Sequence, residues 1–378
     1  MSIHTLIVAR GVPFEQNPLN GIFEWDQAMA LAKAGVEVDY FAVDLRSFRR
    51  IRPWGVRHGE KDGVRWHSIS IPVGAIPLWG LCKIGAMALR RLYRKTFRVV
   101  DHVPDIIHAH FTEIGYMAAE LAEEERLSLV ITEHSSKIIQ PIISDTLKRI
   151  AKKAYYGAAC VLAVSSSLKK RIYQHTGVVA RVVPNIVANE YHYGKCEHVG
   201  INFVSVATLT QGKRIDILLR AFERLSAIYG DVTLEIVGDG EQRDSLQELA
   251  KKLHISNKVR FHGTLARQNI DALYKRCDCF VLPSAFETFG VAYIEAMAAG
   301  LPVIATRCGG PETFVNSDNG ILIPVDDEDA LIHAMKTMYS SKNQFDGEKI
   351  SCDTKKLFSE RAVAQFLEGI YEEILGIS

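Results

Sequence analysis

The chain has 378 residues, 48% of them hydrophobic, which is enough for two or three globular domains with sizeable cores and argues against intrinsic disorder. Its formal net charge is only +1. No apolar run reaches the roughly 18 residues that a membrane span needs, and the start of the chain lacks a charged and then apolar signal sequence, so we expect a cytoplasmic protein.

The N-terminal half alternates buried strand patterns with helix-like segments. After the first strand, a polar loop from Arg10 to Asn20 leads to Gly21 and an amphipathic helix that ends near Gly35. This alternation favours a parallel sheet with helices on both faces. Strands are predicted at residues 4–9, 36–43, 105–108, 128–132, 160–164 and 181–183.

Residues 46–98 form a basic block within this half. They contain thirteen Lys or Arg against two acidic residues, a local charge of +11. Trp54 and Trp79 lie in the block and suit a lipid headgroup boundary. The block indicates an anionic membrane surface as a partner, with a solvated face over ordinary core residues as the alternative; nucleic acid is not expected, because no recognised binding module is present. A helix is predicted in the second part of the block. Its basic face, at i, i+4 spacing, carries Arg90, Arg94 and Arg98, and its apolar face carries Leu81, Ile84, Ala88 and Leu92.

A second series of strands follows an irregular polar stretch that runs from Pro184 to about Gly200. The two series predict two doubly wound domains, residues 1–188 and 189–358, which bind ligands in a cleft between facing strand ends. A last helical pattern runs from Ser359 to Leu375. The strands of the second series are predicted at residues 201–206, 233–237, 259–261, 279–282, 303–305 and 321–323.

Two short pairs of residues are of metal-binding type but lack a complete ligand set. Cys277 and Cys279 are the only close pair among seven scattered cysteines, without a second pair at zinc-finger spacing. His108 and His110 face the same side of a predicted strand, but no acidic or Cys partner follows at ligand spacing. We therefore expect buried thiols and no metal.

The segment from Pro283 to Pro302 carries the strongest functional pattern. It follows an apolar strand and reads as a turn and a short helix that Thr288 can cap. Glu287 and Glu295 lie eight positions apart, which separates their carboxylates by up to about 12 Å along a helix. This distance excludes the carboxylate pair of a glycosidase, whose members lie about 5 to 9.5 Å apart.

The same spacing suits a ligand that has hydroxyls at both ends and an anion between them, as a nucleotide sugar has. Free backbone amides at the start of the helix favour a phosphate, and they belong to Phe289, Gly290 and Val291. The alternative is a solvated Glu287 before an amphipathic helix that carries Glu295 on its surface.

Together with the two-sheet layout and several flanking motifs, these carboxylates resemble the retaining nucleotide-sugar glycosyltransferases of family 4, or glycosyl transferases group 1. The resemblance covers nearly the whole chain. The N-terminal motifs are Gly-Ile-Phe at 21–23, Asp-Ile-Ile-His-Ala-His at 105–110, Thr-Glu-His at 132–134, Val-Ser at 164–165 and Pro-Asn at 184–185. The C-terminal motifs are Ile-Val-Gly-Asp-Gly at 236–240, Phe-His-Gly at 261–263, Ala-Met-Ala-Ala-Gly-Leu-Pro-Val at 296–303 and Gly-Gly-Pro-Glu at 309–312.

The family implies the GT-B fold, an α/β architecture of two doubly wound Rossmann-like domains facing across a cleft. It also implies that the C-terminal helix, about residues 359–378, packs back on the N-terminal domain. The apolar residues expected to take part are Phe358, Val363, Phe366, Ile370 and Ile374.

The resemblance also implies roles for individual residues. Glu295 holds the ribose hydroxyls and Lys213 the diphosphate. Glu287 holds the hydroxyls of the donor sugar, and His134 lies near the reacting sugar. The region after Gly263 packs against the base. The implied catalytic residues are thus His134, Lys213 and Glu287, and the further binding residues are Gly21, Thr208, Arg214, Gly238, Gly263, Thr264, Leu265, Phe289, Gly290, Val291 and Glu295.

The sequence departs from the family pattern at two places. Thr208 stands five residues before Lys213, where many members have an Arg, so half of the cationic clamp is missing or is supplied by Arg214. Asn20 and Gly21 stand where many members have two glycines, which leaves the acceptor and phosphate contacts of that loop open.

We therefore expect a retaining hexosyltransferase that needs no metal or other cofactor. It moves a sugar from a nucleotide diphosphate donor, with UDP favoured over GDP, to a carbohydrate or lipid-linked glycan acceptor. Surface polysaccharide or lipopolysaccharide synthesis at the inner face of the plasma membrane is the implied setting. The alternatives are a nucleotide-sugar epimerase on the same fold and a catalytically silent sugar-binding protein.

Overall fold

The structure is a computed structural model that describes residues 2–13, 20–47, 54–97, 102–341 and 344–377. The chain divides into two compact units. The N-terminal unit comprises Met1–Ile186 and Glu360–Ser378, and the C-terminal unit comprises Val187–Ser359. Both are doubly wound α/β units, which confirms the predicted fold class.

The residues of the N-terminal unit that the structure describes form one sheet with the strand order β3-β4-β2-β1-β5-β6-β7-β8. All neighbouring strands are parallel except β3 and β4. The central strands are fully buried, as expected for a parallel sheet covered on both faces. The strands are β1 (His4–Ala9), β2 (Glu37–Ser47), β3 (Gly55–Lys61), β4 (Val64–Val73), β5 (Ile106–His110), β6 (Ser128–Glu133), β7 (Cys160–Ala163) and β8 (Arg181–Val182).

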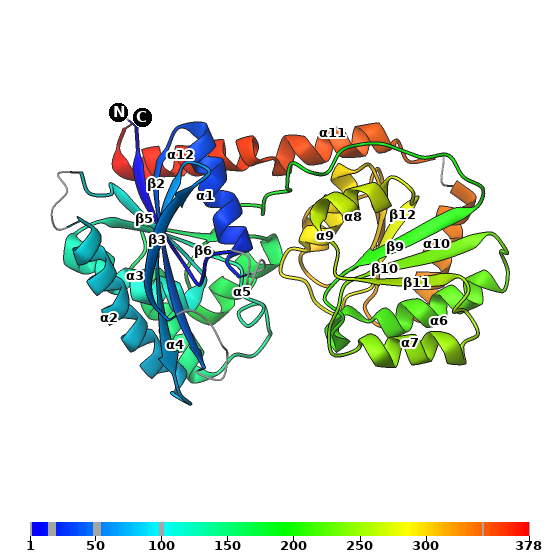
Figure 1. Ribbon diagram of the computed structural model, residues 1–378, viewed down its shortest axis with the longest axis horizontal. Coiled ribbons are helices and arrows are strands. Elements are labelled where there is room, and N and C mark those ends of the chain that lie inside the picture. Colours follow the sequence, from blue (N-terminus) through cyan, green and yellow to red (C-terminus); the bar gives the residue numbers. More distant parts are fainter. Residues whose placement is uncertain (1, 14–19, 48–53, 98–101, 342–343, 378) are drawn as a thin grey trace. The chain divides into compact units, whose positions relative to one another are not determined.

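Helices cover both faces of this sheet (Figure 1). One face packs against α1 and α12, and their shared core includes Trp25, Leu31, Tyr40 and Leu367. On the other face, Phe41 of β2 stacks on Phe97 of α2 with ring centroids 5.7 Å apart. The helices of this unit are α1 (Ile22–Ala34), α2 (Leu78–Phe97), α3 (Thr112–Glu125), α4 (Asp145–Tyr156), α5 (Ser166–Thr176) and α12 (Glu360–Leu375).

The antiparallel hairpin of β3 and β4 was absent from the sequence prediction, which treated this region as part of a basic block. β3 lies at the sheet edge and is almost entirely exposed, so it has no apolar alternation. Asp62 and Gly63 join the two strands, both with positive φ, as a two-residue hairpin turn requires. This Asp-Gly pair is the signal that predicts the hairpin.

The described part of the C-terminal unit contains six parallel strands in the order β11-β10-β9-β12-β13-β14, with the reversal between β9 and β12. The strands are β9 (Ile201–Val206), β10 (Val232–Val237), β11 (Val259–Gly263), β12 (Cys279–Leu282), β13 (Val303–Thr306) and β14 (Gly320–Ile323). The helices are η1 (Gln211–Lys213), α6 (Ile215–Ser226), α7 (Arg243–Lys252), α8 (Arg267–Tyr274), α9 (Val291–Ala298), η2 (Pro311–Thr313), α10 (Glu328–Ser341) and α11 (Gly347–Phe358).

Two features near the C-terminus differ from the prediction. Residues 340–356 read as a polar stretch in the sequence, with no helix predicted, but they contain α11, which begins where the Asp346 side chain accepts a hydrogen bond from the amide of Lys349 at 3.0 Å. In α12, Phe366 is 39% exposed, whereas Leu367 is fully buried. Phe358 ends α11 in the C-terminal unit and packs edge-on against Phe314. Val363 and Ile370 of α12 are buried, and Ile374 is partly buried against the same core, as predicted, so the prediction for this helix was wrong at Phe366.

None of the helices in the described ranges is both long enough and apolar enough to span a membrane. The described thiols differ in burial. Cys82, Cys277 and Cys279 are buried, whereas Cys196 and Cys352 are exposed. The prediction of buried thiols was thus wrong for Cys196 and Cys352.

The two neighbouring residues of α12 give a direct stability test. Leu367→Ala is expected to lower the free energy of unfolding by about 2 to 5 kcal/mol, because a fully buried side chain is replaced by a cavity. Phe366→Ala is the control and is expected to cost at most about 1 kcal/mol. Urea unfolding followed by circular dichroism measures both. Equal losses for the two variants would contradict this burial pattern.

Candidate functional site

The carboxyl ends of β9 and β12 mark the switch point of the C-terminal sheet, where doubly wound folds bind ligands. The loop after β9 carries Thr208, Lys213 and Arg214, and the loop after β12 carries Glu287. The sheet thus brings the predicted cation and the predicted carboxylate to one edge.

Lys213 and Glu287 form an ion pair with Nζ and Oε1 2.6 Å apart. The same carboxylate oxygen accepts a hydrogen bond from the hydroxyl of Ser284 at 2.8 Å. The Glu287 backbone carbonyl accepts a hydrogen bond from the amide of Gly310 at 2.9 Å, so the loop after β13 is tied to the same place. Glu287 is only 9% exposed, and its charge is matched by the ammonium.

Helix α9 begins beside this pair, at Val291. The residue before it is Gly290, with φ of 96°, and a Cβ there would lie 2.7 Å from the Tyr293 ring. No side chain caps the helix, so the predicted cap at Thr288 is wrong: a left-handed residue ends the turn instead. Among the described residues, no side chain accepts a capping hydrogen bond from the first amides of α9, and these amides carry the partial positive charge of a helix N-terminus. Phe289 itself is buried.

Glu295 lies one helical turn further on, half-buried and next to Tyr191. Burial raises the pKa of Tyr191, and the nearby Glu295 carboxylate, which accepts the phenol hydrogen bond, raises it further. The tyrosine therefore stays a neutral donor. Sequence reasoning missed Tyr191, since it lies in the irregular stretch between the two strand series.

Arg214 is already paired in this structure. Its guanidinium donates to Asp326 through Nε at 2.6 Å and Nη2 at 3.2 Å. Thr208, the residue at the position of the family's Arg, is exposed. Lys213 is thus the cation that this loop brings to Glu287.

The remaining predicted binding residues of this unit follow β10 and β11. Gly238 has φ of 131°, and a Cβ there would lie 1.8 Å from the carbonyl oxygen of Ala207 in the loop after β9. Its amide donates to the carbonyl of Gly263 at 2.8 Å. Thr264 is exposed and Leu265 half-buried. These loops therefore meet at the same sheet edge as Lys213.

In the N-terminal unit, His134 directly follows β6, whose last residue is Glu133. The buried Glu133 carboxylate accepts hydrogen bonds from the amides of His134 at 2.9 Å and Ser135 at 2.7 Å. The hydroxyls of Thr112 and Tyr155 donate to its other oxygen. Burial raises the pKa of Glu133. This carboxylate shapes the turn that carries His134, although the motif at 132–134 predicts only His134 as a site residue.

His134 belongs to a row of buried imidazoles with His108 and His110. His110 Nδ1 and His134 Nε2 share a hydrogen bond at 3.1 Å, and the rings of His108 and His110 stack with centroids 4.6 Å apart. Both nitrogens of His108 are occupied, by the hydroxyls of Tyr371 and Thr132. Burial lowers the pKa of both His108 and His134 to about 3, and it lowers that of His110 as well.

A cavity of about 480 Å³ opens next to His134. Arg10 contributes to its wall, with its guanidinium carbon 3.3 Å from the centre of the Phe111 ring and its Nε 3.1 Å from Glu24. Gly21 lies at the adjacent turn with φ of 81°, and a Cβ there would lie 2.2 Å from the carbonyl oxygen of Gly11. Only glycine fits this close approach between the start and the end of the loop that joins β1 to α1.

Much of the basic face predicted on α2 is neutralised within the unit. Arg90 pairs with Glu120 and Glu124 of α3, each at 3.0 Å, and Arg94 also pairs with Glu124. Burial alone would raise the pKa of the Glu120 carboxyl. Hydrogen bonds from Lys153 and Lys83 outweigh this effect and lower the pKa to about 2. The predicted Arg98 lies outside the described residues. Trp79 and Met87 remain 59% exposed.

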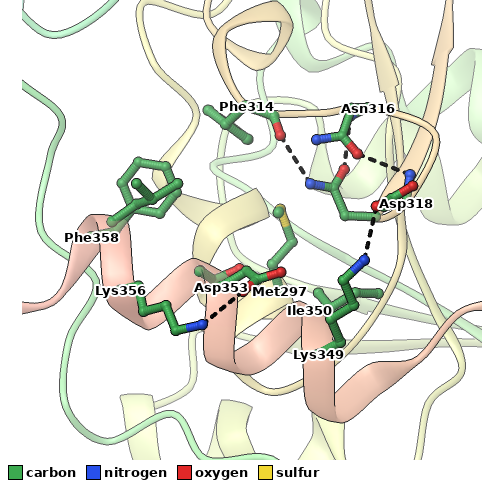
Figure 2. A pocket seen from close by; sticks show the side chains of 12 residues that line it. Met297, Phe314, Asn316, Asp318, Lys349, Ile350, Asp353, Lys356 and Phe358 are labelled. Atoms are coloured by element: carbon green, nitrogen blue, oxygen red, sulfur yellow. Dashed lines mark hydrogen bonds and ion pairs between the residues drawn. The ribbon is translucent and has the colours of Figure 1, made fainter.

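A second cavity, of about 350 Å³, lies between α11 and the loop that precedes β14 (Figure 2). Its apolar wall includes Phe314 and Phe358. Its two lysines, Lys349 and Lys356, are paired with the carboxylates that line it, Asp318 at 2.9 Å and Asp353 at 3.2 Å. The lysines at this cavity are thus already matched by carboxylates, which makes it a poorer site for a diphosphate than the edge at Lys213.

Comparison with known proteins identifies the family. Residues 25–191 match the model for Glycosyltransferase Family 4, and residues 200–349 match the model for Glycosyl transferases group 1. The chain belongs to the group 1 glycosyltransferases. The predicted family is thereby confirmed.

Alignments with two curated relatives cover different shares of this chain. An uncharacterized glycosyltransferase of Methanocaldococcus jannaschii is 31% identical over 242 residues, which is 58% of this chain and 62% of that protein. The N-acetyl-alpha-D-glucosaminyl L-malate synthase of Bacillus anthracis is 29% identical over 293 residues, 72% of this chain and 75% of that protein. The match to the first relative thus spans less than two thirds of that relative's length.

Solved structures agree with the GT-B fold of this family member. Sucrose-phosphate synthase from Thermosynechococcus elongatus has a TM-score of 0.79 at 22% identity, over 100% of both chains. Anabaena HepE in complex with UDP has a TM-score of 0.75 at 20% identity, over 98% of this chain and 100% of that one.

The buried imidazoles predict a pH-dependent stability. The unfolded chain takes up protons near pH 6.5, whereas His134 in the fold takes one up only near pH 3, so acidification between these values favours unfolding. Each such histidine is expected to cost about 1.4 kcal/mol per pH unit in this window. Unfolding free energies measured between pH 4 and 6 are expected to fall less steeply in His134→Gln. The exposed His333→Gln is the control, and equal slopes for all three proteins would contradict the assignment.

Proposed function

We propose that this protein is a retaining glycosyltransferase that transfers a sugar from a nucleoside diphosphate sugar to a carbohydrate or lipid-linked glycan. The observation that carries the proposal is the Lys213–Glu287 pair at the start of α9, because it joins a cation for the diphosphate to an acceptor for sugar hydroxyls. UDP as the favoured nucleotide is supported by the fold likeness to HepE, whose structure contains UDP.

Lys213 is proposed to act on the leaving group. As the glycosidic bond breaks, the diphosphate gains charge, and a fixed ammonium then stabilises the transition state more than the ground state. The amides at the start of α9 add partial positive charge in the same region. We propose that these groups replace the divalent ion that other transferases use.

Retention is proposed to proceed on one face of the sugar. Glu287 is held by Lys213 and Ser284, so it is positioned to bind hydroxyls rather than to attack carbon. The acceptor oxygen forms the new bond to the anomeric carbon while the bond to the leaving phosphate breaks. The acceptor proton passes to the departing phosphate oxygen, which balances the step without an enzyme nucleophile.

His134 is proposed to contact the reacting sugar as a neutral imidazole. Because burial lowers its pKa to about 3, it does not serve as a cationic acid at neutral pH. Its bond to His110 orients the ring. Glu295, assisted by Tyr191, is proposed to hold the ribose hydroxyls of the donor.

The acceptor is proposed to be presented at the inner face of a membrane. After the internal pairing of Arg90 and Arg94, α2 still exposes Trp79, Met87 and two cations, Arg91 and Lys95. An aromatic side chain with neighbouring cations suits an anionic headgroup layer. A role in surface polysaccharide or lipopolysaccharide synthesis would follow from such an acceptor.

Donor turnover tests the function. The protein is incubated with a panel of UDP and GDP sugars, and release of the nucleotide, with and without acceptor, is followed by chromatography. Slow release from one donor is expected. Conversion of the donor to its epimer would favour the epimerase instead, and binding without turnover would favour a silent sugar-binding protein.

Two neighbouring cations sharpen this test. Lys213→Ala is expected to lower kcat by about 2.7 to 4 kcal/mol of transition-state stabilisation, with a smaller change in KM. Arg214→Ala is the matched control and is expected to retain most turnover, because that guanidinium is bound to Asp326. A larger loss in Arg214→Ala than in Lys213→Ala would reverse the assignment of the diphosphate cation.

Membrane contact is tested by sedimentation with anionic vesicles. Reversing the two exposed charges of α2, as Arg91→Glu with Lys95→Glu, is expected to weaken binding by about 2 kcal/mol or more, since each cation near the surface contributes about 1 kcal/mol. Lys169→Glu with Lys170→Glu on α5 makes the same change of net charge and is expected to have a smaller effect. Binding that does not weaken with salt, or that is equal on neutral vesicles, would reject this surface.

A further inference from the structure

We propose that His4, Glu37 and His102 form a Zn²⁺ site in the N-terminal unit. Each residue offers one ligand atom, and these atoms all lie within 4.8 Å of one another. His102 Nε2 and the Glu37 carboxylate are 3.4 Å apart. Ligand atoms at Zn²⁺ distances of about 2.0 to 2.2 Å in tetrahedral geometry are separated by about 3.3 Å, so this pair is already near its metal-bound spacing.

His4 supplies a second, independent indication. It is 1% exposed, and its Nε2 lies 2.7 Å from Oδ2 of Asp39, whereas its Nδ1 has no hydrogen-bond partner among the residues that the structure describes. A carboxylate on one imidazole nitrogen fixes the tautomer and leaves the other nitrogen with a lone pair, which is the arrangement that supports metal-bound histidines. The orphaned buried nitrogen is explained if it is a ligand.

The backbone brings the three residues together before any ion binds. His4 and Glu37 begin β1 and β2 and are register partners in the sheet. The amide of His4 donates to the Asp105 carboxylate at 2.8 Å, and the amide of Asp105 donates to the His4 carbonyl at 2.8 Å. This pair of bonds fixes the segment before β5, so His102 stacks on His4 with ring centroids 4.9 Å apart.

The charges at the site favour a dication. Arg65 donates to Glu37 at 2.6 Å and to Asp39 at 2.8 Å, which offsets one of the two carboxylates and leaves a net charge of −1 from these three groups. Arg65 contacts Oε1 of Glu37, whereas His102 lies nearest to Oε2, so the second oxygen is available to a metal. Two imidazoles and one carboxylate prefer Zn²⁺ to Mg²⁺.

The position of the site indicates a structural role. His4 and Glu37 lie at the amino ends of parallel strands, and His134 follows the carboxyl end of β6 in the same sheet. The two places thus lie at opposite ends of the parallel strands. The ion would join the starts of β1 and β2 to the segment that leads into β5. This inference does not depend on the proposed transferase activity.

Calorimetry on the untagged full chain, after treatment with EDTA and dialysis, tests the site with ZnCl₂ and, separately, with MgCl₂. Wild type is expected to bind Zn²⁺ at a site that the His102→Ala variant weakens at least tenfold. His102 is exposed, so its removal leaves the fold intact. His333→Ala, another exposed histidine, is the matched control and is expected to bind like wild type.

Two further measurements identify the ligands. Glu37→Gln is expected to weaken Zn²⁺ binding, and Co²⁺ in place of Zn²⁺ is expected to give the visible absorption of a tetrahedral site in wild type but not in His102→Ala. A hundredfold excess of Zn²⁺ over its Kd is expected to raise the melting temperature of the N-terminal unit by about 5 to 10 °C. Equal Zn²⁺ affinity in wild type and His102→Ala, or equal losses in His102→Ala and His333→Ala, would overturn the proposal.

Discussion

Parallel hydrogen bonding between β5 and β6 decides where the polar groups of the N-terminal unit lie. The register pairs His110, the last residue of β5, with Thr132, two residues before His134, so the two imidazoles meet at the carboxyl ends of the strands at 3.1 Å. A slip of one residue would turn each of these side chains to the other face of the sheet. Backbone pairing therefore specifies the imidazole row.

Two buried carboxylates are stabilised against the cost of desolvation by different kinds of groups. Glu287 has an ammonium and a hydroxyl, whereas Glu133 has only neutral donors, two of them backbone amides. A charge matched by the ammonium of Lys213, which is carried on a long side chain, can be shared with a ligand. A charge held by the backbone of its own turn instead makes that turn rigid. The arrangement at Glu287 therefore suits a contact that a ligand can exchange, whereas the arrangement at Glu133 suits a structural support.

The sequence predicts the central strands and the residues at their ends because buried parallel strands are continuous apolar runs, and the family motifs follow them. It fails where burial gives no periodic signal or where the partner is distant in the chain. The exposed β3 has no apolar alternation. The carboxylates that neutralise Arg90 lie on α3, some 30 residues away in the chain, so the spacing of basic residues along α2 does not indicate this pairing. Gly290 rather than Thr288 starts α9 because the turn needs a left-handed residue, which the capping rule does not weigh.

The chain leaves the N-terminal unit after Ile186 and returns to it at Glu360. During synthesis the C-terminal unit is therefore complete while its predecessor still lacks α12, whose residues Leu367 and Tyr371 fill the core beside Trp25. Until α12 leaves the ribosome, an apolar face of the N-terminal unit stays uncovered. The two cores are thus closed in the reverse of the order in which the two units begin along the chain.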